Sequence, residues 1–232
     1  MKQIALISCI KEDLKSFEAM EIVGGLTQPS KLPCYSYDIP IESCKTGMKL
    51  AKKKGTVCSE CYGGAGWYPI RKYKQDARLR ALRNPRWTEA MIILIERLSP
   101  DFFRWHDIGD VQSLEHLQKI FDVCLGTPDT KHWLPTHEHK LIEVAIKSRG
   151  MKVPDNLNIQ LSADMLDEAG PVKLARELGL TISAVSTDGQ YSCPAPDQFN
   201  SCQNCRKCWD RNNFVTIFLY HRGKKHGSPT HG

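Results

Sequence analysis

The chain has 232 residues, of which 41% are hydrophobic and 25% are charged, and its formal net charge is +6. This composition is typical of a globular protein with its own core, and the length leaves room for one large or two small domains. The longest apolar run, Ala90–Ile95, is far too short to cross a bilayer, so a transmembrane protein is excluded and no membrane partner is expected.

A first β-strand is predicted at Ile4–Ile10. Charged residues follow it at once and no small-residue cleavage site comes after it, so the stretch lacks the features of a signal peptide and we expect a cytoplasmic protein. Gly, Pro and Ser then recur up to about residue 68, which predicts a loop-rich segment. We expect three parts in one compact unit: residues 1–68, a β/α core at 69–192, and a cysteine-rich part at 193–232.

From residue 69 onward, helices and strands alternate. Two helices are predicted at residues 70–84 and 86–99, separated by Pro85. Strands follow at 102–107, 131–136, 156–163 and 181–187, helices between them at 113–125, 139–150 and 170–179, and a last strand at 214–221. This alternation predicts an α/β fold, either a partial (β/α) barrel of the TIM type or an open parallel sheet. In both, the functional face lies at the C-terminal ends of the strands.

Polar residues follow four of these strands directly, and in a parallel sheet they would converge on one pocket. A helix N-cap is the alternative explanation for any single one of them. Asp107 and Asp164 are candidates for a general acid, a base or a nucleophile, whereas His106, His137 and His139 could bind a ligand, carry protons or only form hydrogen bonds. The candidate catalytic residues are His106, Asp107, Asp110, His137, Glu138, Asp164 and Asp188.

Positive charge is concentrated between Lys45 and Arg86. Twelve Lys and Arg residues stand there against two acidic residues, so this segment carries +10 and the rest of the chain −4. Aromatic residues are interleaved with them, a combination typical of a surface that contacts nucleic-acid phosphates; a solvated helix face is the alternative. The expected nucleic-acid contacts are Lys52, Lys53, Lys54, Arg71, Lys72, Lys74 and Arg78.

The chain contains ten cysteines, which is many for a cytoplasmic protein. In a reducing compartment, clustered Cys-x-x-Cys spacing indicates metal binding more often than disulfides. Cys9 and Cys124 have no cysteine nearby and are expected to be buried as small apolar residues. The other eight form an N-terminal group, Cys34, Cys44, Cys58 and Cys61, and a C-terminal group, Cys193, Cys202, Cys205 and Cys208.

Either group could hold zinc or an iron–sulfur cluster of the 4Fe-4S type, since four thiolates satisfy both. One pair from each group could also share a single metal. The predicted metal ligands are Cys58, Cys61, Cys202, Cys205 and Cys208. Cys34, Cys44 and Cys193 are expected to join them, and buried thiols are the alternative for these three.

Several motifs together resemble the phage and actinobacterial family named after gene product 88. They are "PSKLPCYSYDIPIESCKTGMKLAKKKGTVCSECY", "FRWHDIGDVQSLEHL", "HWLPTHE", "CPAP" and the "CxxCxxCW" pattern, which span roughly Pro29 to Trp209. The resemblance implies a bacteriophage or mobile-element protein that works in the cytoplasm of a bacterial host. It supplies context more than mechanism.

A part of the chain is similar to radical S-adenosylmethionine enzymes, which have partial β/α barrels and cysteine-bound clusters. The "CSECY" run at Cys58–Tyr62 looks like the end of their cluster motif, and Gly109–Asp110 would stand where their glycine-rich strand end contacts S-adenosylmethionine. Their C-x3-C-x2-C spacing is not kept, because Cys44 lies 14 positions before Cys58. This departure speaks against S-adenosylmethionine chemistry, although a cluster can still bind.

A shorter resemblance is to the tRNA- and DNA-guanine transglycosylases. Their "DSGGFQ" strand end is echoed by "DIGDVQ" at Asp107–Gln112, and the resemblance implies acid/base work for Asp107 and a nucleophile at Asp164 or Asp188. Their zinc site would correspond to Cys202, Cys205, Cys208 and His221.

Three hypotheses follow from the sequence. The first is an iron–sulfur enzyme that acts on a nucleic acid or nucleotide. The second is a zinc-stabilised enzyme that exchanges bases in DNA or RNA. The third is a metal-stapled protein without enzymatic activity that binds nucleic acid or a host regulator.

Overall fold

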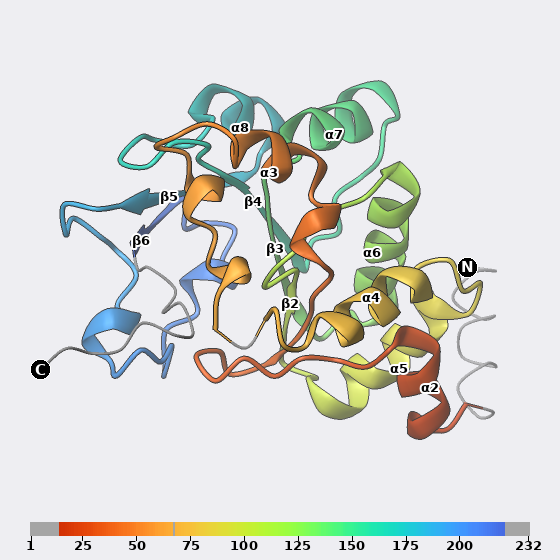
Figure 1. Ribbon diagram of the computed structural model, residues 1–232. Helices are drawn as coiled ribbons and strands as arrows, with labels where there is room; N and C mark the ends of the chain where they lie inside the picture. Colours follow the sequence, from red (N-terminus) through yellow and green to blue (C-terminus); the bar gives the residue numbers. More distant parts are fainter. Residues whose placement is uncertain (1–13, 67, 221–232) are drawn as a thin grey trace, which may run out of the picture.

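In the computed structural model, six parallel strands form one sheet in which every strand pairs with its neighbour in chain order (Figure 1). The predicted α/β class and parallel sheet are therefore confirmed. In the described part of the chain the sheet is open, because the first and last strands each have one partner. The strands are β1 Tyr35–Tyr37, β2 Phe102–Trp105, β3 Lys131–Thr136, β4 Leu157–Ser162, β5 Thr181–Ser186 and β6 Val215–Leu219.

The structure describes residues 14–66 and 68–220. The strand predicted at Ile4–Ile10, Cys9 and the basic stretch from His221 onward lie outside the described residues. Within these residues, no helix has both the length and the apolar character that crossing a membrane requires.

Most predicted helices lie where the sequence places them. Pro85 separates α4 from α5, the Ser113 hydroxyl accepts a hydrogen bond from the His116 amide at the start of α6, and Gly179 ends α8 in the left-handed conformation. The helix predicted after β3 is a short α7 that continues as a π-helical turn, Val144–Ser148. The helices are α2 Ser16–Val23, α3 Lys45–Leu50, α4 Lys72–Ala81, α5 Trp87–Leu98, α6 Leu114–Gly126, α7 His139–Glu143 and α8 Val172–Leu178.

The N-terminal part contains a strand and helices that the sequence did not reveal. β1 has three residues, too few for a period-two pattern, and it stands in a stretch rich in Gly, Pro and Ser. Pairing with β2 and an isolated bridge between Thr27 and Ser36 hold it in place. The region predicted to be loop-rich therefore supplies one edge strand of the sheet, and the C-terminal part supplies the other, β6.

The two faces of the sheet differ in chemistry. The outer face carries apolar side chains such as Phe103, Leu134 and Ile159, which pack with α5, α6, α7 and α8 in one core; Figure 1 shows α5 and α6 at the right and α7 and α8 at the top. The inner face combines aromatic side chains, among them Trp133 and Phe218, with polar ones. Trp133 Nε1 donates to Gln160 Oε1 at 3.2 Å, and Gln160 Nε2 donates to Thr216 Oγ1 at 3.3 Å. The C-terminal cysteine segment covers this inner face.

His132, on the outer face, makes folding sensitive to acid. It is buried between aromatic rings, and burial lowers its pKa from 6.5 to about 3. The unfolded chain takes up the proton near pH 6.5, so this contribution to stability is complete above pH 6.5 and is lost as the pH falls toward 3. Between pH 6.5 and 3, the free energy of unfolding of His132→Leu should therefore fall by about 4 kcal/mol less than that of the wild type. Urea unfolding at several pH values measures both. Equal losses would contradict the assignment.

Candidate metal centre at the strand ends

A long connection lies across the C-terminal edge of the sheet. After β1 the chain runs through α3 and three 3-10 turns, at Ile41–Ser43, Val57–Glu60 and Tyr62–Gly64, before it reaches α4. Backbone hydrogen bonds fix this connection to the residues that follow β4: the Val57 amide donates to the Asp164 carbonyl at 2.9 Å, and the Leu166 amide donates to the Gly55 carbonyl at 2.9 Å. It therefore brings Cys44, Cys58 and Cys61 over the strand ends.

Two of the predicted carboxylates, Asp110 and Glu138, join separate segments of the chain at this edge. Asp110, after β2, accepts hydrogen bonds from the Thr136 hydroxyl at 2.6 Å and the His137 amide at 2.8 Å. Burial raises the pKa of Asp110 to about 6, although these hydrogen bonds act against the shift. Glu138 accepts from the amide and the hydroxyl of Thr46, at 2.8 and 2.9 Å, and so ties the start of α3 to the end of β3. Both residues lie at the predicted edge and have structural partners.

His137, His139 and Asp164 form a compact group at the ends of β3 and β4. His137 Nδ1 lies 3.1 Å from Asp164 Oδ1, and its ring also hydrogen-bonds Cys58. Burial alone would lower the pKa of His137, but the bonds to Asp164 and Cys58 raise it to about 10. The hydrogen bond from His137 lowers the pKa of Asp164. This pair therefore links the predicted strand-end residues to the N-terminal thiols.

Three thiols lie close enough together for their charges to interact, those of Cys44, Cys58 and Cys61. Burial raises the pKa of Cys44 and of Cys61 above the ordinary thiol value, and each neighbouring thiol adds to the shift. A Cβ atom placed on Gly47 would lie 3.5 Å from Cys58 Sγ and 3.8 Å from Cys44 Sγ. The absence of a side chain at Gly47 thus lets the backbone of α3 pack closely against both cysteines.

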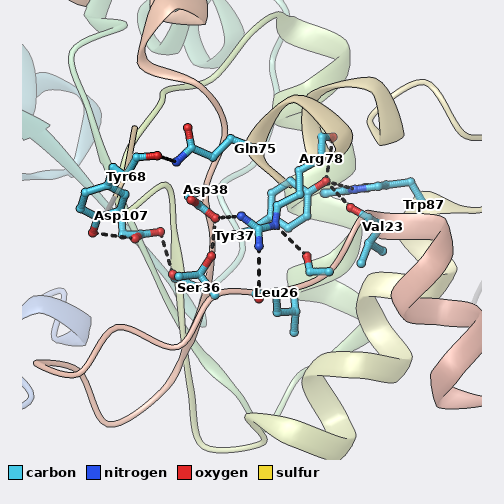
Figure 2. Close-up of polar contacts among 12 residues, drawn as sticks. Val23, Leu26, Ser36, Tyr37, Asp38, Tyr68, Gln75, Arg78, Trp87 and Asp107 are labelled. Atoms are coloured by element: carbon cyan, nitrogen blue, oxygen red, sulfur yellow. Dashed lines mark hydrogen bonds and ion pairs between the residues drawn. The ribbon is translucent and has the colours of Figure 1, made fainter. Parts of the chain in front are cut away.

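Asp107 lies deeper, beneath the same edge. Its carboxylate accepts hydrogen bonds from Ser36 Oγ at 2.7 Å and Tyr68 Oη at 3.0 Å (Figure 2). Burial raises the pKa of Asp107 and the nearby Asp38 raises it further, whereas Arg104 and the two hydroxyl groups oppose the shift. A buried carboxyl group with a raised pKa beside a second carboxylate is a candidate proton donor or acceptor.

Arg104 is a site residue that sequence reasoning missed. It stands on the inner face of β2, with its guanidinium 4.5 Å from the ring centre of Trp133 and Nη2 3.3 Å from Tyr62 Oη. Its positive charge also acts on the thiols of Cys34 and Cys208, where it opposes the rise in pKa that burial causes. Arg104 therefore lies between the two groups of cysteines. An arginine within the predicted strand "FFRW" was the available signal, because an isolated charge on a buried strand needs a partner.

The four cysteines of the C-terminal group line one pocket, as their spacing predicts. Asn158 Nδ2 donates to the Cys208 carbonyl at 2.9 Å, and Trp209 Nε1 donates to the Phe103 carbonyl at 2.9 Å, so the segment is fixed to the inner face of the sheet. The pocket lining includes Cys193, Cys202, Cys205 and Cys208.

The assignment of Cys34 to the N-terminal group is wrong. Cys34 is buried against Trp133, Cys208 and Trp209, and it is an electrostatic neighbour of Cys202. The reason is the position of β1: Cys34 precedes this strand and Cys44 follows it, so the two residues lie at opposite ends of the sheet. Burial raises the pKa of Cys34 to about 12, and Arg104 acts against this shift.

Two other candidates do not join the group at the edge. His106 has a positive φ of 55°, lies in the core with its ring centre 5.2 Å from that of His116, and burial lowers its pKa well below the ordinary value. Asp188, after β5, is exposed and accepts hydrogen bonds from the Ser186 hydroxyl and the Gln190 amide. The bond from Ser186 lowers the pKa of Asp188.

The expected nucleic-acid contacts separate into exposed and buried residues. Arg78 is a correction: its side chain is 4% exposed, pairs with Asp38 and donates to the Gly25 and Leu26 carbonyls, so it is inaccessible to a phosphate (Figure 2). Lys72 pairs with Asp76 on α4 at 2.7 Å. The exposed members of the set are Lys52, Lys53, Lys54, Arg71 and Lys74.

A cavity of about 330 Å³ opens beside the strand-end group. His139 and Asp164 line it together with Lys53 and Glu168, so the site has acidic and basic groups within reach of a small ligand. Its lining also includes Leu50, Met165, Ala169, Gly170 and Pro171.

No curated protein and no solved structure is significantly similar to the chain. A family model described as gene product 88 matches residues 11–211, which include every strand of the sheet except β6 and both groups of cysteines. This match confirms the resemblance inferred from the sequence motifs. The chain belongs to the gene product 88 family.

Proposed function

We propose that the protein is an iron–sulfur enzyme that acts on a nucleic acid or nucleotide at the C-terminal ends of its strands. The observation that carries this proposal is the convergence of Cys44, Cys58 and Cys61 on the edge that also holds His137 and Asp164. Cysteine thiolates are the usual ligands of iron–sulfur clusters. Three thiolates would leave one iron of a 4Fe-4S cluster without a cysteine ligand.

Cys44, Cys58 and Cys61 are the proposed ligands of the cluster at the strand ends. Two glycines pack closely in this connection: a Cβ atom on Gly47 would lie 3.0 Å from Cys44 Cβ, and one on Gly63 would lie 2.6 Å from Ile41 Cγ2. Among the described residues, no three cysteine sulfur atoms lie within 4.8 Å of one another. Thiolates bound to one tetrahedral zinc at 2.3 Å would be about 3.8 Å apart. The proposal of a cluster therefore rests on the three thiols that share this edge and not on a distance between their sulfur atoms.

The C-terminal thiols fit a structural role. They are held on the inner face of the sheet, away from the strand ends, and Cys202 and Cys208 are buried. Burial raises the pKa of both thiols, whereas Arg104 supplies a positive charge that favours thiolates. We propose that Cys193, Cys202, Cys205 and Cys208 hold a second iron–sulfur cluster that fixes this segment to the sheet.

A partial (β/α) barrel is the architecture that best explains the two faces of the sheet. The strands follow one another without a reversal of order, which is the connectivity of barrels and not of doubly wound sheets. The inner face is filled by aromatic and polar side chains and by the C-terminal segment, as the interior of a small barrel is filled by side chains.

Positive charge at the cavity supports a substrate with phosphate groups. Lys53 lines the cavity, and Lys52 and Lys54 are exposed beside it on the same connection. Electrostatic contact with phosphates weakens as salt concentration rises because counterions are released on binding.

Replacing Lys52, Lys53 and Lys54 by Ala is expected to weaken binding of a single-stranded DNA or RNA oligonucleotide about tenfold or more at low salt and to reduce the salt dependence. Fluorescence anisotropy with anaerobically prepared protein measures both. The matched control replaces three exposed lysines that are distant in sequence from the cavity lining, Lys15, Lys131 and Lys152, with Ala. Equal losses in both triple variants would show nonspecific attraction and contradict a substrate site at this cavity.

The site predicts contact between substrate and cluster. The electron paramagnetic resonance signal of the reduced N-terminal cluster is expected to change when an oligonucleotide or a nucleoside triphosphate is added. A signal that stays the same with oligonucleotide and with nucleotide, at concentrations that saturate binding, would contradict an enzymatic role for this cluster.

A further inference from the structure

We propose that His137, His139 and Asp164 bind a single divalent transition-metal ion at the cavity, separate from any cluster on the cysteines. In the described part of the chain, this is the one group of three or more His, Cys, Asp or Glu side chains whose ligand atoms all lie within 4.8 Å of one another. Two imidazoles and one carboxylate with open positions are the ligand set of non-haem Fe²⁺ sites.

The separation of His137 Nδ1 and Asp164 Oδ1 is compatible with two ligands of one ion. Two ligand atoms, each about 2.1 Å from an ion and about 95° apart, are separated by about 3.1 Å. His137 Nδ1 and Asp164 Oδ1 are 3.1 Å apart. The ion would take the place of the hydrogen bond between these two atoms.

The surroundings orient the imidazoles for this role. His139 Nε2 lies 2.9 Å from the Ser162 carbonyl oxygen, which can only accept, so this nitrogen carries the proton and Nδ1 is left to bind an ion. His137 has its backbone amide fixed by Asp110 at 2.8 Å, and its ring hydrogen-bonds Cys58. Hydrogen bonds from ligand imidazoles to carbonyl and other acceptors are the usual second set of contacts around protein metal ions.

The ion would face solvent-accessible space. His139 and Asp164 line the cavity of about 330 Å³, and Asp164 has 42% of its side chain exposed. Three protein ligands leave positions on the ion for water or a substrate oxygen. Since Lys53 lines the same cavity, an anionic oxygen donor such as a phosphate is the ligand class favoured at those positions.

Mn²⁺ is the probe that isolates this site, because hard Mn²⁺ binds carboxylate and imidazole ligands and has little affinity for thiolates. Full-length protein, prepared anaerobically, is titrated with MnCl₂, and free Mn²⁺ is followed by electron paramagnetic resonance. We expect one Mn²⁺ per chain, bound about tenfold or more weakly in Asp164→Asn and in His139→Ala. The matched control Asp129→Asn removes an exposed carboxylate elsewhere and is expected to bind as the wild type does.

Absence of stoichiometric binding in the wild type, or equal affinity in the wild type and Asp164→Asn, would overturn the proposal. Circular dichroism spectra and thermal melts of the variants without metal check that they are folded. Melting of the wild type, but not of His139→Ala, should shift upward on addition of Mn²⁺. Iron and sulfide analysis of the same variants separates this site from the cysteine clusters: we expect their cluster content to be unchanged.

Discussion

Replacing Arg78 by Met is expected to lower the free energy of unfolding by about 3–5 kcal/mol, because the substitution leaves Asp38 as a buried carboxylate without its partner. The side chains of both residues are 4% exposed. Arg78 also donates to the Gly25 carbonyl at 3.0 Å, and its own carbonyl accepts from Tyr37 Oη at 2.9 Å, so α4 is joined through it to β1 and the loop after α2 (Figure 2). Urea unfolding monitored by circular dichroism measures the change.

The control for this prediction is Arg80→Met, two residues further along α4. Arg80 is exposed, so we expect a change within about 0.5 kcal/mol. If the two variants unfold at the same urea concentration, the ion pair contributes no more than a surface charge and the account of α4 docking is wrong. The double variant Asp38→Leu with Arg78→Met is expected to recover part of the loss, since no unpaired charge is left buried.

The second large effect is expected for Cys205→Ser. The cysteine is partly exposed and differs from serine by one atom, so little packing is lost. If Cys205 binds the proposed C-terminal cluster, loss of this ligand should nevertheless lower the free energy of unfolding by about 3 kcal/mol or more, because the binding free energy of a structural metal is folding free energy. The measurement is denaturant unfolding under anaerobic conditions, together with the iron content of each sample.

Asn204→Ser is the matched control, an exposed neighbour in the same loop that is not expected to bind metal. Its stability should stay within about 0.5 kcal/mol of the wild type. A Cys205→Ser protein with unchanged stability and unchanged iron content would remove Cys205 from the ligand set. Unchanged stability with reduced iron would show that this cluster does not hold the C-terminal segment on the sheet.

The strands of the core could be predicted because their sequences carry strong local signals. β3, β4 and β5 are runs of six residues bounded by turn-forming residues, and all three lie where the pattern places them. β1 could not be predicted, since three residues between prolines carry no periodicity and pairing with β2 makes them a strand. This strand adds an edge to the predicted sheet and separates Cys34 from the other cysteines of the N-terminal group.

The candidate site was predictable to the extent that topology alone determines it. In a parallel sheet, the C-terminal ends of the strands lie at one edge whatever conformation the loops adopt. This places Asp107, Asp110, His137 and Asp164 at that edge. The sequence did not show which of these residues have structural partners, because Asp110 and Glu138 are paired by backbone amides and hydroxyl groups far away in the chain. Likewise, nothing in the sequence distinguishes Arg78 from the exposed basic residues, because its burial depends on the fold.

The contacts that join the two groups of cysteines depend on tertiary packing. Arg104 reaches Tyr62 across 42 residues, and Tyr68 reaches Asp107 across 39 residues. No spacing rule connects such positions in a single sequence. The same holds for Cys34, which has its place beside Cys208 because both lie on the inner side of the sheet.

Iron and acid-labile sulfide, counted per chain in anaerobically prepared protein, test the central claim most directly. The comparison is between the wild type and a variant in which Cys44, Cys58 and Cys61 are all Ser. With one 4Fe-4S cluster in each group, the wild type should hold about eight iron and eight sulfide per chain and the variant about half of each, with the fold intact. Equal iron and sulfide contents in the two proteins, or stoichiometric zinc without sulfide in the wild type, would contradict a cluster at the strand ends.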